Sequence, residues 1–481
     1  MKTLKLLSTC VTLLLALGQP QFVIAARKGD SSLKPRIVVL TDIAPITGEP
    51  DDMESMVRFL VHADLFEIEG IIASSGWNNS GSLYPIGWLD SLHTCINAYE
   101  KDLPKLMKRS AQKKFNSLKK ESGKQKMGYW PSADYIRSRT MLGSRGFGHK
   151  LLSKDNDSDG SNLIIRLVDE SDERPLWIAV WGGGNTLAQA LWRVKQERNT
   201  AEVKKFVSKL RVYTITDQDV PWGERNELKT TSHYWMRKEF GRDLFFIWDE
   251  SAWLTHNALG RNHWNEYAAN IQNHGNLGAI YPKYKWGVEG DTPSFLYLLP
   301  NGLSTPEKCN QASWGGYFEW MLSRDGETSC YTNHIGRVKK ASQKYEEYFY
   351  PAVFNNFAAR MDWVKDSAGN RNPIATVNGQ TGLAPIHLSA VAGNSIRLDA
   401  SKSSDPDGNM LTYKWWLLPE AGSYTGEIEL DTPAAPATTV TVPADAAGKE
   451  LHVICEITDN GIPALTAYRR IIIKVKKSMQ P

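Results

Sequence analysis

Short apolar runs that end in polar turns constrain the fold of this chain more than any other feature. Residues 37–40 read Ile-Val-Val-Leu, as expected of a strand buried on both faces of a parallel sheet. The run ends at Thr41 and Asp42, residues 53–60 then place apolar side chains at helical spacing, and residues 66–73 return to strand character. This order predicts a βαβ unit.

The same pattern returns further along the chain. Residues 176–180 form an apolar run that breaks at three glycines, 182–184, before a segment with helical periodicity, and further strands are predicted at 210–215 and 244–247. Strands that alternate with helices predict an α/β fold with an open, mostly parallel sheet and flanking helices. In such sheets the ligand crevice lies at the carboxyl ends of the strands.

The length of 481 residues predicts at least two domains. Residues 366–373 are polar and turn-rich, and helical periodicity disappears after them. We therefore predict a first domain over 33–365, a linker over 366–373 and an all-β sandwich over 374–481, built from short strands separated by turns such as 405–408.

The N-terminus has the character of an export signal. Lys2 and Lys5 precede an apolar run at 11–17, and small residues near Ala25 supply a cleavage site, which predicts a signal peptide over 1–25 and a secreted or periplasmic protein. A lipoprotein interpretation through Cys10 fits less well, because the apolar stretch mostly follows that cysteine. No later segment has the length and hydropathy of a transmembrane helix.

Charge argues against a nucleic acid partner. The formal net charge of +4 falls to roughly +2 once the signal peptide is removed, which is too small for a polyanion-binding protein. The lysines scattered over 101–126 indicate a solvated surface segment. The longer insertion over 101–154 is a candidate to close over the crevice and shape its selectivity.

Four cysteines remain after the signal peptide, and their spacing does not match a zinc site. Export to an oxidising compartment favours one disulfide, and we predict that it joins Cys309 to Cys330, in a stretch rich in loops. The sequence does not fix this connectivity, nor the oligomeric state.

Three carboxylates gather at the first strand-to-helix turn, namely Asp42, Asp51 and Asp52. One acid at a helix N-terminus is ordinary capping. Three together repel one another unless they share a cation, and Ca²⁺ prefers oxygen ligands. On the pattern alone, metal binding and helix capping both remain open.

Four segments in the same order resemble the nucleoside hydrolases: 38–52 with its aspartates, 69–75, the glycine turn within 178–188, and 289–295. The further segments 217–219, 275–282, 289–300 and 314–316 resemble, more specifically, the bacterial nucleoside-hydrolase-like cellulose-binding proteins, which also carry a C-terminal β-sandwich. This resemblance covers almost the whole mature chain and implies a nucleoside-hydrolase-like fold.

The resemblance also implies roles at the turn. Asp42 would be a ligand of Ca²⁺, or of another divalent cation, and the candidate base; Asp52 and Asp291 would complete the metal site with the backbone carbonyl of Trp181. Asp51 would act beside Asp42 in the catalytic pair and contact sugar hydroxyls. A bound cation lowers the pKa of a coordinated water, and nearby carboxylates stabilise an oxocarbenium-like transition state.

Two departures change the expected chemistry. The loop between Asp42 and Asp51 is longer than in nucleoside hydrolases, and Gly290 stands where they carry a histidine beside the last metal aspartate. Without a general acid at that position, cleavage of nucleosides is disfavoured. Glu289 and Asp219 are alternative proton donors, and each has the competing interpretation of a structural carboxylate.

Several further residues are predicted to line the substrate crevice. Asn78 and Asn79 follow the second strand, although Asn-Asn-Ser-Gly is also a turn sequence. Trp77, Trp181 and Trp222 are placed to stack on sugar faces, although many of the 17 tryptophans must be core residues. The predicted substrate-binding set is Asp51, Trp77, Asn78, Asn79, Asp219, Trp222 and Glu289.

The C-terminal segment 399–416 resembles the start of PKD-like and other immunoglobulin-like modules of secreted bacterial enzymes, with Trp415 or Trp416 as the core tryptophan. A spacer and a polysaccharide-binding role both remain open for it. For the whole chain, the sequence predicts a secreted, metal-assisted hydrolase of N- or O-glycosidic bonds that uses a Ca²⁺-bound water and an aspartate cluster. The alternative is a carbohydrate-binding protein, for a cellulose-like polysaccharide, that kept the fold without the chemistry.

Overall fold

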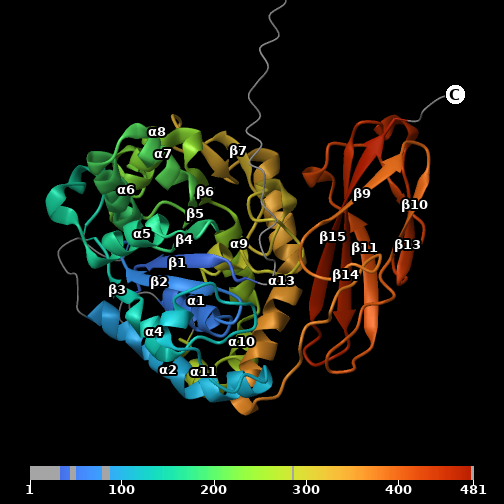
Figure 1. Cartoon of the computed structure of the whole chain (residues 1–481), viewed down its shortest axis with the longest axis horizontal. Coiled ribbons are helices and arrows are strands. Elements are labelled where there is room, and N and C mark those ends of the chain that lie inside the picture. The colour runs from blue at the N-terminus through green and yellow to red at the C-terminus, as the bar shows by residue number, and fades with distance from the viewer. Residues whose placement is uncertain (1–32, 44–49, 78–86, 145, 284–286, 478–481) are drawn as a thin grey trace, which may run out of the picture.

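The protein consists of two domains that lie side by side, with the long helix α13 (Gly336–Asp366) at their boundary (Figure 1). The computed structural model describes residues 33–43, 50–77, 87–144, 146–283 and 287–477. The predicted signal peptide over 1–25, and the candidate residues Asn78 and Asn79, lie outside these described residues.

A mostly parallel sheet with flanking helices forms the N-terminal domain, as the sequence predicts. Its strands occur in the order β3-β2-β1-β4-β5-β6-β8-β7, in which β7 pairs antiparallel with β8 and the other recorded pairings are parallel. The strands are β1 (Arg36–Thr41), β2 (Glu67–Ala73), β3 (Thr140–Leu142), β4 (Leu176–Val180), β5 (Leu210–Ile215), β6 (Phe245–Asp249), β7 (Glu319–Leu322) and β8 (Ser329–Thr332).

Helices cover the two faces of this sheet (Figure 1). They are α1 (Pro50–Leu60), α2 (Gly87–Arg109), α3 (Leu118–Glu121), α4 (Ala133–Ser138), α5 (Asp159–Asp169), α6 (Asn185–Glu197), α7 (Thr200–Ser208), α8 (Ser232–Phe240), α9 (Ala252–Asn262), α10 (Trp264–Asn270), α11 (Gly275–Ile280), α12 (Pro293–Leu296) and α13.

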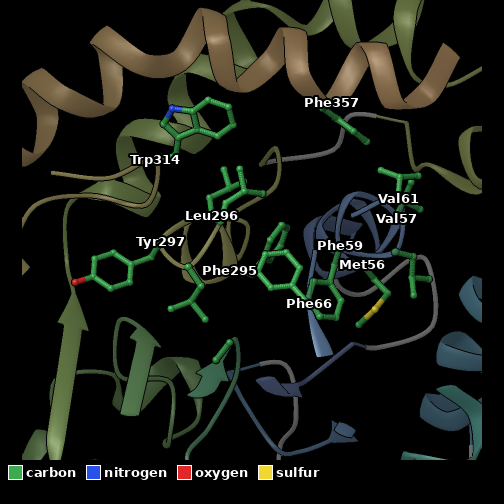
Figure 2. Packing of buried hydrophobic residues seen from close by; sticks show 14 of the residues in the cluster. Met56, Val57, Phe59, Val61, Phe66, Phe295, Leu296, Tyr297, Trp314 and Phe357 are labelled. Carbon is green, nitrogen blue, oxygen red and sulfur yellow. The ribbon is translucent and has the colours of Figure 1, made fainter. Parts of the chain in front are cut away.

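Strand β1 shows why the sheet is covered on both sides. Ile37 and Val39 pack into one hydrophobic cluster, whereas Val38 and Leu40 pack into a second cluster on the opposite face. Since side chains alternate along a strand, a continuous apolar run fits only a strand that is buried on both faces. Figure 2 shows part of the first cluster, in which Phe59 of α1 lies among Phe66 and Phe295.

The strand order places a topological switch point at β1. The chain leaves β1 for β2 and β3 on one side and then returns to β4, β5 and β6 on the other side. Two neighbouring crossovers therefore diverge at the carboxyl ends of β1 and β4, which is where ligands bind in open α/β sheets. Asp42 follows β1, and Gly182 to Gly184 follow β4.

The C-terminal domain contains two packed sheets, with strand orders β10-β13-β12 and β11-β14-β15-β9. Their strands are β9 (Ile386–Val391), β10 (Ser395–Asp399), β11 (Leu411–Leu417), β12 (Glu429–Leu430), β13 (Ala437–Thr441), β14 (Glu450–Asp459) and β15 (Thr466–Lys476). Trp415 is buried in the core of this domain. Trp416 points the opposite way on β11, as the next residue of a strand must.

Trp416 packs against α13 at the domain boundary. Its ring lies 5.4 Å from that of Tyr348, and Phe349 of the same helix contacts Tyr468 of β15 edge to face. The segment after α13 is also anchored, because Asn370 donates a hydrogen bond of 2.8 Å to Asp459. The C-terminal domain is therefore docked on the first domain through aromatic and polar contacts.

The predicted disulfide is wrong. Cys309 and Cys330 are both free thiols, and they are buried in the two hydrophobic clusters on opposite faces of the sheet. Burial raises the pKa of both thiols, to about 12 for Cys330. The loop-rich sequence around the two cysteines does not indicate which face of the sheet each side chain packs against.

The insertion over 101–154 is only partly a crevice element. Its first part belongs to α2, which packs against α11 and α13, and the buried Asp102 accepts a hydrogen bond of 2.8 Å from the amide of Leu277. Its later part contacts a predicted site residue, because the amide of Gly148 donates a hydrogen bond to Asp219. None of the helices in the described part of the chain has the length and hydropathy to cross a bilayer.

Phe59 provides a test of the core. It is fully buried, and its ring lies 5.2 Å from that of Phe295 and 6.3 Å from that of Trp181. Phe59→Ala should lower the free energy of unfolding by about 3–5 kcal/mol because a large cavity opens. Phe115→Ala, at a ring that is 40% exposed, should cost less than about 1 kcal/mol. Urea denaturation of both variants measures these values, and equal costs would contradict the described core.

Candidate functional site

Asp42 lies between two glycines at the switch point. A β-carbon at Gly182, after β4, would be 2.6 Å from Asp42 Oδ1, and one at Gly76, after β2, would collide with the same carboxylate. Ser74 continues the β1 ladder by donating to the carbonyl of Thr41. The neighbouring strand ends thus leave room for one buried carboxylate, and no larger residue fits at either glycine.

Asp51 and Asp52 open helix α1 on the other side of Asp42. Asp52 is buried and accepts a hydrogen bond from the hydroxyl of Thr41. Burial raises the pKa of Asp52 well above its usual range, and the charges of Asp42 and Asp51 raise it further. The three acids therefore form one electrostatically coupled cluster, which ordinary helix capping does not require.

Two further segments reach the cluster, through Gly182 next to Trp181 and through Gly290 next to Asp291. A β-carbon at Gly290 would lie 2.6 Å from Asp51 Oδ2, so a histidine at that position would collide with Asp51. Asp291 is buried, and its carbonyl accepts a hydrogen bond of 2.7 Å from Ser294. The indole of Trp181 donates to the same Ser294 hydroxyl. A side chain at position 290 would therefore require Asp51 to move.

The side chain of Trp181 is a core residue. It is fully buried and packs against Phe59 and Phe295, so the expectation that this ring stacks on a sugar is wrong. Its backbone carbonyl accepts a hydrogen bond from the side-chain amide of Gln218. A carbonyl oxygen has two lone pairs, so this contact leaves one for another partner.

Oxygen donors at this place are of the kind that Ca²⁺ uses. Asp42, Asp52 and the Trp181 carbonyl supply two carboxylates and one neutral oxygen, and a cation would relieve the repulsion that raises the pKa of Asp52. Within the described ranges, no three His, Cys, Asp or Glu side chains converge into a metal-binding group. The types of donor at this place therefore suit a hard cation.

Glu289 belongs to a structural network. Its Oε2 pairs with Arg58 and accepts hydrogen bonds from Tyr267, at 3.2 Å, and from His256, at 3.3 Å. Despite burial, the positive charge of Arg58 holds the pKa of Glu289 below its usual range. A carboxylate paired in this way anchors α1 to α9, which supports the structural interpretation of Glu289. Its roles as a proton donor and as a sugar contact remain predictions.

Asp219 lies against Gly183 of the glycine turn. Its Oδ2 accepts hydrogen bonds from the amides of Ser232, at 2.5 Å, and Gly148, at 3.1 Å, and also from the hydroxyl of Ser232. Its Oδ1 is buried and has no hydrogen-bond partner in the described structure, and a β-carbon at Gly183 would lie 3.0 Å from it. Burial raises the pKa of Asp219 to about 7.

Two of the predicted aromatic residues form a pair, and one of them, Trp77, follows Gly76, which lies against Asp42. The rings of Trp77 and Trp222 meet edge to face with centroids 4.7 Å apart, and Trp222 is 56% exposed. The guanidinium of Arg225 lies 4.6 Å from the centre of the Trp222 ring. An exposed indole of this kind is a suitable surface for the apolar face of a sugar.

The structure adds residues that the sequence analysis missed. Asn257 of α9 lies beside Gly287 and Gly290, where its amide faces the same small space as Asp51. Gln218 and Ser232 hold the Trp181 carbonyl and Asp219. No local sequence pattern identifies Asn257 as a site residue. Gln218 lies inside the Asp-Gln-Asp segment, so it could have been predicted from the sequence.

The raised pKa of Asp219 predicts a dependence of stability on pH. The folded state keeps this proton at pH values where the unfolded chain has lost it, so the carboxyl destabilises the fold as pH rises from about 4 to about 7. The free energy of unfolding of Asp219→Asn relative to wild type should rise by up to about 4 kcal/mol over this window and stay constant above it.

Urea denaturation at several pH values measures this difference. Ser232→Ala removes a hydrogen bond that stabilises the carboxylate, so it should extend the window to higher pH. A difference between Asp219→Asn and wild type that does not vary between pH 4 and 8 would contradict the raised pKa.

Comparisons with known proteins agree with the fold described above. The family model described as "Cellulose-binding Sde182, nucleoside hydrolase-like domain" matches residues 36–318, and "Cellulose-binding protein Sde0182, C-terminal domain" matches residues 395–475. A solved structure of a nucleoside hydrolase-related hypothetical protein from Saccharophagus degradans, described as associated with carbohydrate metabolism, is 34% identical. It aligns over 92% of this chain and 100% of its own, with a TM-score of 0.75.

Likenesses of the C-terminal domain alone are weak. The PKD domain from KIAA 1837 protein is 20% identical over 20% of this chain and 84% of its own, with a TM-score of 0.16. Mouse cadherin-23 EC22-24 is 19% identical over 22% of this chain and 33% of its own, with a TM-score of 0.17. No curated protein matches the chain. The two family models and the full-length structural match show that this chain belongs to the nucleoside-hydrolase-like, cellulose-binding Sde182 family.

Proposed function

We propose that this protein is a divalent-cation-assisted hydrolase of glycosyl bonds in carbohydrates. The observation that carries the proposal is that the cluster of Asp42, Asp51 and Asp52 lies against Gly182 of the glycine turn and that Asp219 lies against the next glycine, Gly183. Two kinds of carboxyl group, one within a cluster of like charges and one whose pKa is raised mainly by burial, are what acid and base roles require. The family description and the carbohydrate association of the structural relative support a glycan as the substrate.

Each carboxylate has a distinct role in this proposal. Asp42 accepts the proton of the attacking water, and Asp51 binds hydroxyl groups of the sugar whose bond is cleaved. Ca²⁺, held by Asp42, Asp52, the Trp181 carbonyl and Asp291, would supply a positive charge that acidifies water and orients vicinal hydroxyls. Trp77 and Trp222 would stack on the sugar, and the amide of Asn257 would contact hydroxyls next to Asp51.

A polymeric substrate outside the cytoplasm also fits the expected location of the protein. The lysines and apolar run within residues 1–25 support a cleavable signal peptide, and we propose that the mature protein acts outside the cytoplasm. N-terminal sequencing of the protein purified from its native host would show the cleavage. An intact Met1 would contradict it.

A second candidate function is carbohydrate binding without chemistry. It is favoured by the absence, among the residues that the structure describes, of a group of three acidic or other ligating side chains arranged for a metal. In this case the buried acids would serve only to shape and polarise the crevice, and the exposed Trp222 would provide much of the contact with the glycan.

Calcium binding tests the metal part of the proposal. Chelator-treated wild type should bind Ca²⁺ in calorimetric titration, and Asp52→Asn should bind it at least roughly tenfold more weakly because one charged ligand is lost. Asp90→Asn, at an exposed acid of α2, is the matched control and should bind like wild type. Equal affinity of Asp52→Asn and wild type would remove Asp52 from the metal site.

Release of reducing sugar distinguishes the two candidate functions. Wild type incubated with cello-oligosaccharides and Ca²⁺ should release reducing ends, and Asp42→Asn should reduce the rate by about 100-fold to 10,000-fold because the base is lost. Asp155→Asn, at an exposed acid, should retain the wild-type rate. Measurable binding of the oligosaccharides without any release would favour the second candidate function.

A further inference from the structure

The two oxygens of Asp219 have opposite environments. Three donors, the amide and hydroxyl of Ser232 and the amide of Gly148, all point at Oδ2. Oδ1 is buried, has no hydrogen-bond partner in the described structure, and lies next to the bare backbone of Gly183. The structure thus fixes the carboxyl group by one oxygen and keeps the other turned toward the glycine turn.

Resting on the hydrolase function proposed above, we propose that Asp219 is its general acid, and that Oδ1 passes a proton to the leaving group. Gly182 and Gly183 are consecutive, and the Cα atoms of consecutive residues lie about 3.8 Å apart. Asp42 lies against the first glycine and Asp219 against the second. A base and an acid therefore flank one side-chain-free stretch of backbone.

The hydrogen bonds decide which oxygen carries the proton. An oxygen that receives two N–H donors and a hydroxyl is an acceptor, so the proton of the neutral acid resides on Oδ1. Burial raises the pKa of this group to about 7, which keeps it largely protonated in mildly acidic to neutral solution. A general acid functions best when its pKa lies near the working pH.

The elements packed around Asp219 supply few competing charges. Asp217, in the same loop, raises the pKa of Asp219. His233 of α8 is buried, and its pKa is lowered to about 4, so it is neutral at the relevant pH. His149 follows Gly148 in the chain, and the glycine turn contributes no ionisable side chain. The described residues place no cation in a hydrogen bond or ion pair with Asp219 that would force it to ionise.

Other buried acids are less suited to the role. Glu289 is paired with Arg58, and both oxygens of Asp217 have partners, Thr231 on one and the amide of Asp219 on the other. Glu54 has a strongly raised pKa through burial, but it lies a turn into α1, where its Oε2 accepts the amide of Glu289. Asp219 is distinguished by its place beside the glycine turn.

The proposed step balances in atoms and charge. The bond between C1 of the sugar and the leaving oxygen breaks with its electron pair on that oxygen, which takes the proton from Asp219 Oδ1. A water oxygen bonds to C1, and one of its protons passes to Asp42. One water is consumed, two hydroxyl products form, and exchange with solvent restores the protons on both carboxyl groups.

Leaving-group dependence tests this assignment, because an acid matters only when the leaving group needs a proton. The probes are phenyl β-cellobioside, with a poor leaving group, and 2,4-dinitrophenyl β-cellobioside, with a good one. Asp219→Asn should lose about 100-fold to 10,000-fold in kcat/KM on the phenyl probe but less than about 10-fold on the dinitrophenyl probe. The side-chain amide oxygen that this substitution introduces can still accept hydrogen bonds from Ser232 and Gly148.

The pH profile gives a second readout that a structural role would not move. In wild type, kcat/KM on the phenyl probe should fall above about pH 7 as Asp219 loses its proton, and this limb should be absent when Asp219→Asn cleaves the dinitrophenyl probe. Glu54→Gln is the comparison variant and should keep the leaving-group dependence of wild type.

The outcomes separate this assignment from the function on which it rests. Equal loss on both probes, or a wild-type rate of Asp219→Asn on the phenyl probe, would overturn the role of Asp219 and leave the hydrolase intact. A selective loss in Glu54→Gln in place of Asp219→Asn would move the role to Glu54. Failure of wild type to cleave either probe, with Ca²⁺ present, would overturn the hydrolase and the assignment together.

Discussion

The structure depends on the burial of carboxylates at the carboxyl end of its central strand. Asp42 directly follows β1, Asp52 lies in the first turn of α1, and both side chains are buried. Burying like charges together costs free energy unless a cation or specific donors compensate. The surrounding backbone is adapted to this group, with glycines after both neighbouring strands and a glycine in place of a side chain beside Asp51.

The rest of the first domain holds that arrangement in place. Helix α1 is buried on nearly all sides, so its polar residues pair inside the protein: Arg58 with Glu289, Glu54 with the amide of Glu289, and Ser55 with Thr292. These contacts tie the start of α1 to the segment that carries Asp291. The hydrophobic cluster in Figure 2 packs against the same helix, which holds the acidic turn at the start of α1 in place.

The second domain is attached to the first domain along α13. Helix α13 lies between the two domains (Figure 1), with Phe357 among the core residues of the first and Phe349 against Tyr468 of the second. Arg470 of β15 is almost wholly buried, and it donates to the carbonyls of Leu303 and Gln311 in the first domain. Such contacts make the C-terminal domain a fixed part of the molecule, in place of a loosely tethered module.

The sequence by itself determined the parallel sheet, the acidic turn after its first strand and the glycine turn after β4, because apolar runs and turn residues are local signals. Only the tertiary structure decided which acids share an environment. Glu289 and Asp291 are two residues apart, yet Glu289 is paired with Arg58, whereas Asp291 follows Gly290, which lies against Asp51. Cys309 and Cys330 lie on opposite faces of the sheet, and the Trp181 side chain is part of the hydrophobic core. Burial, ion pairing and the side of the sheet depend on residues far apart in the chain, and no local pattern records them.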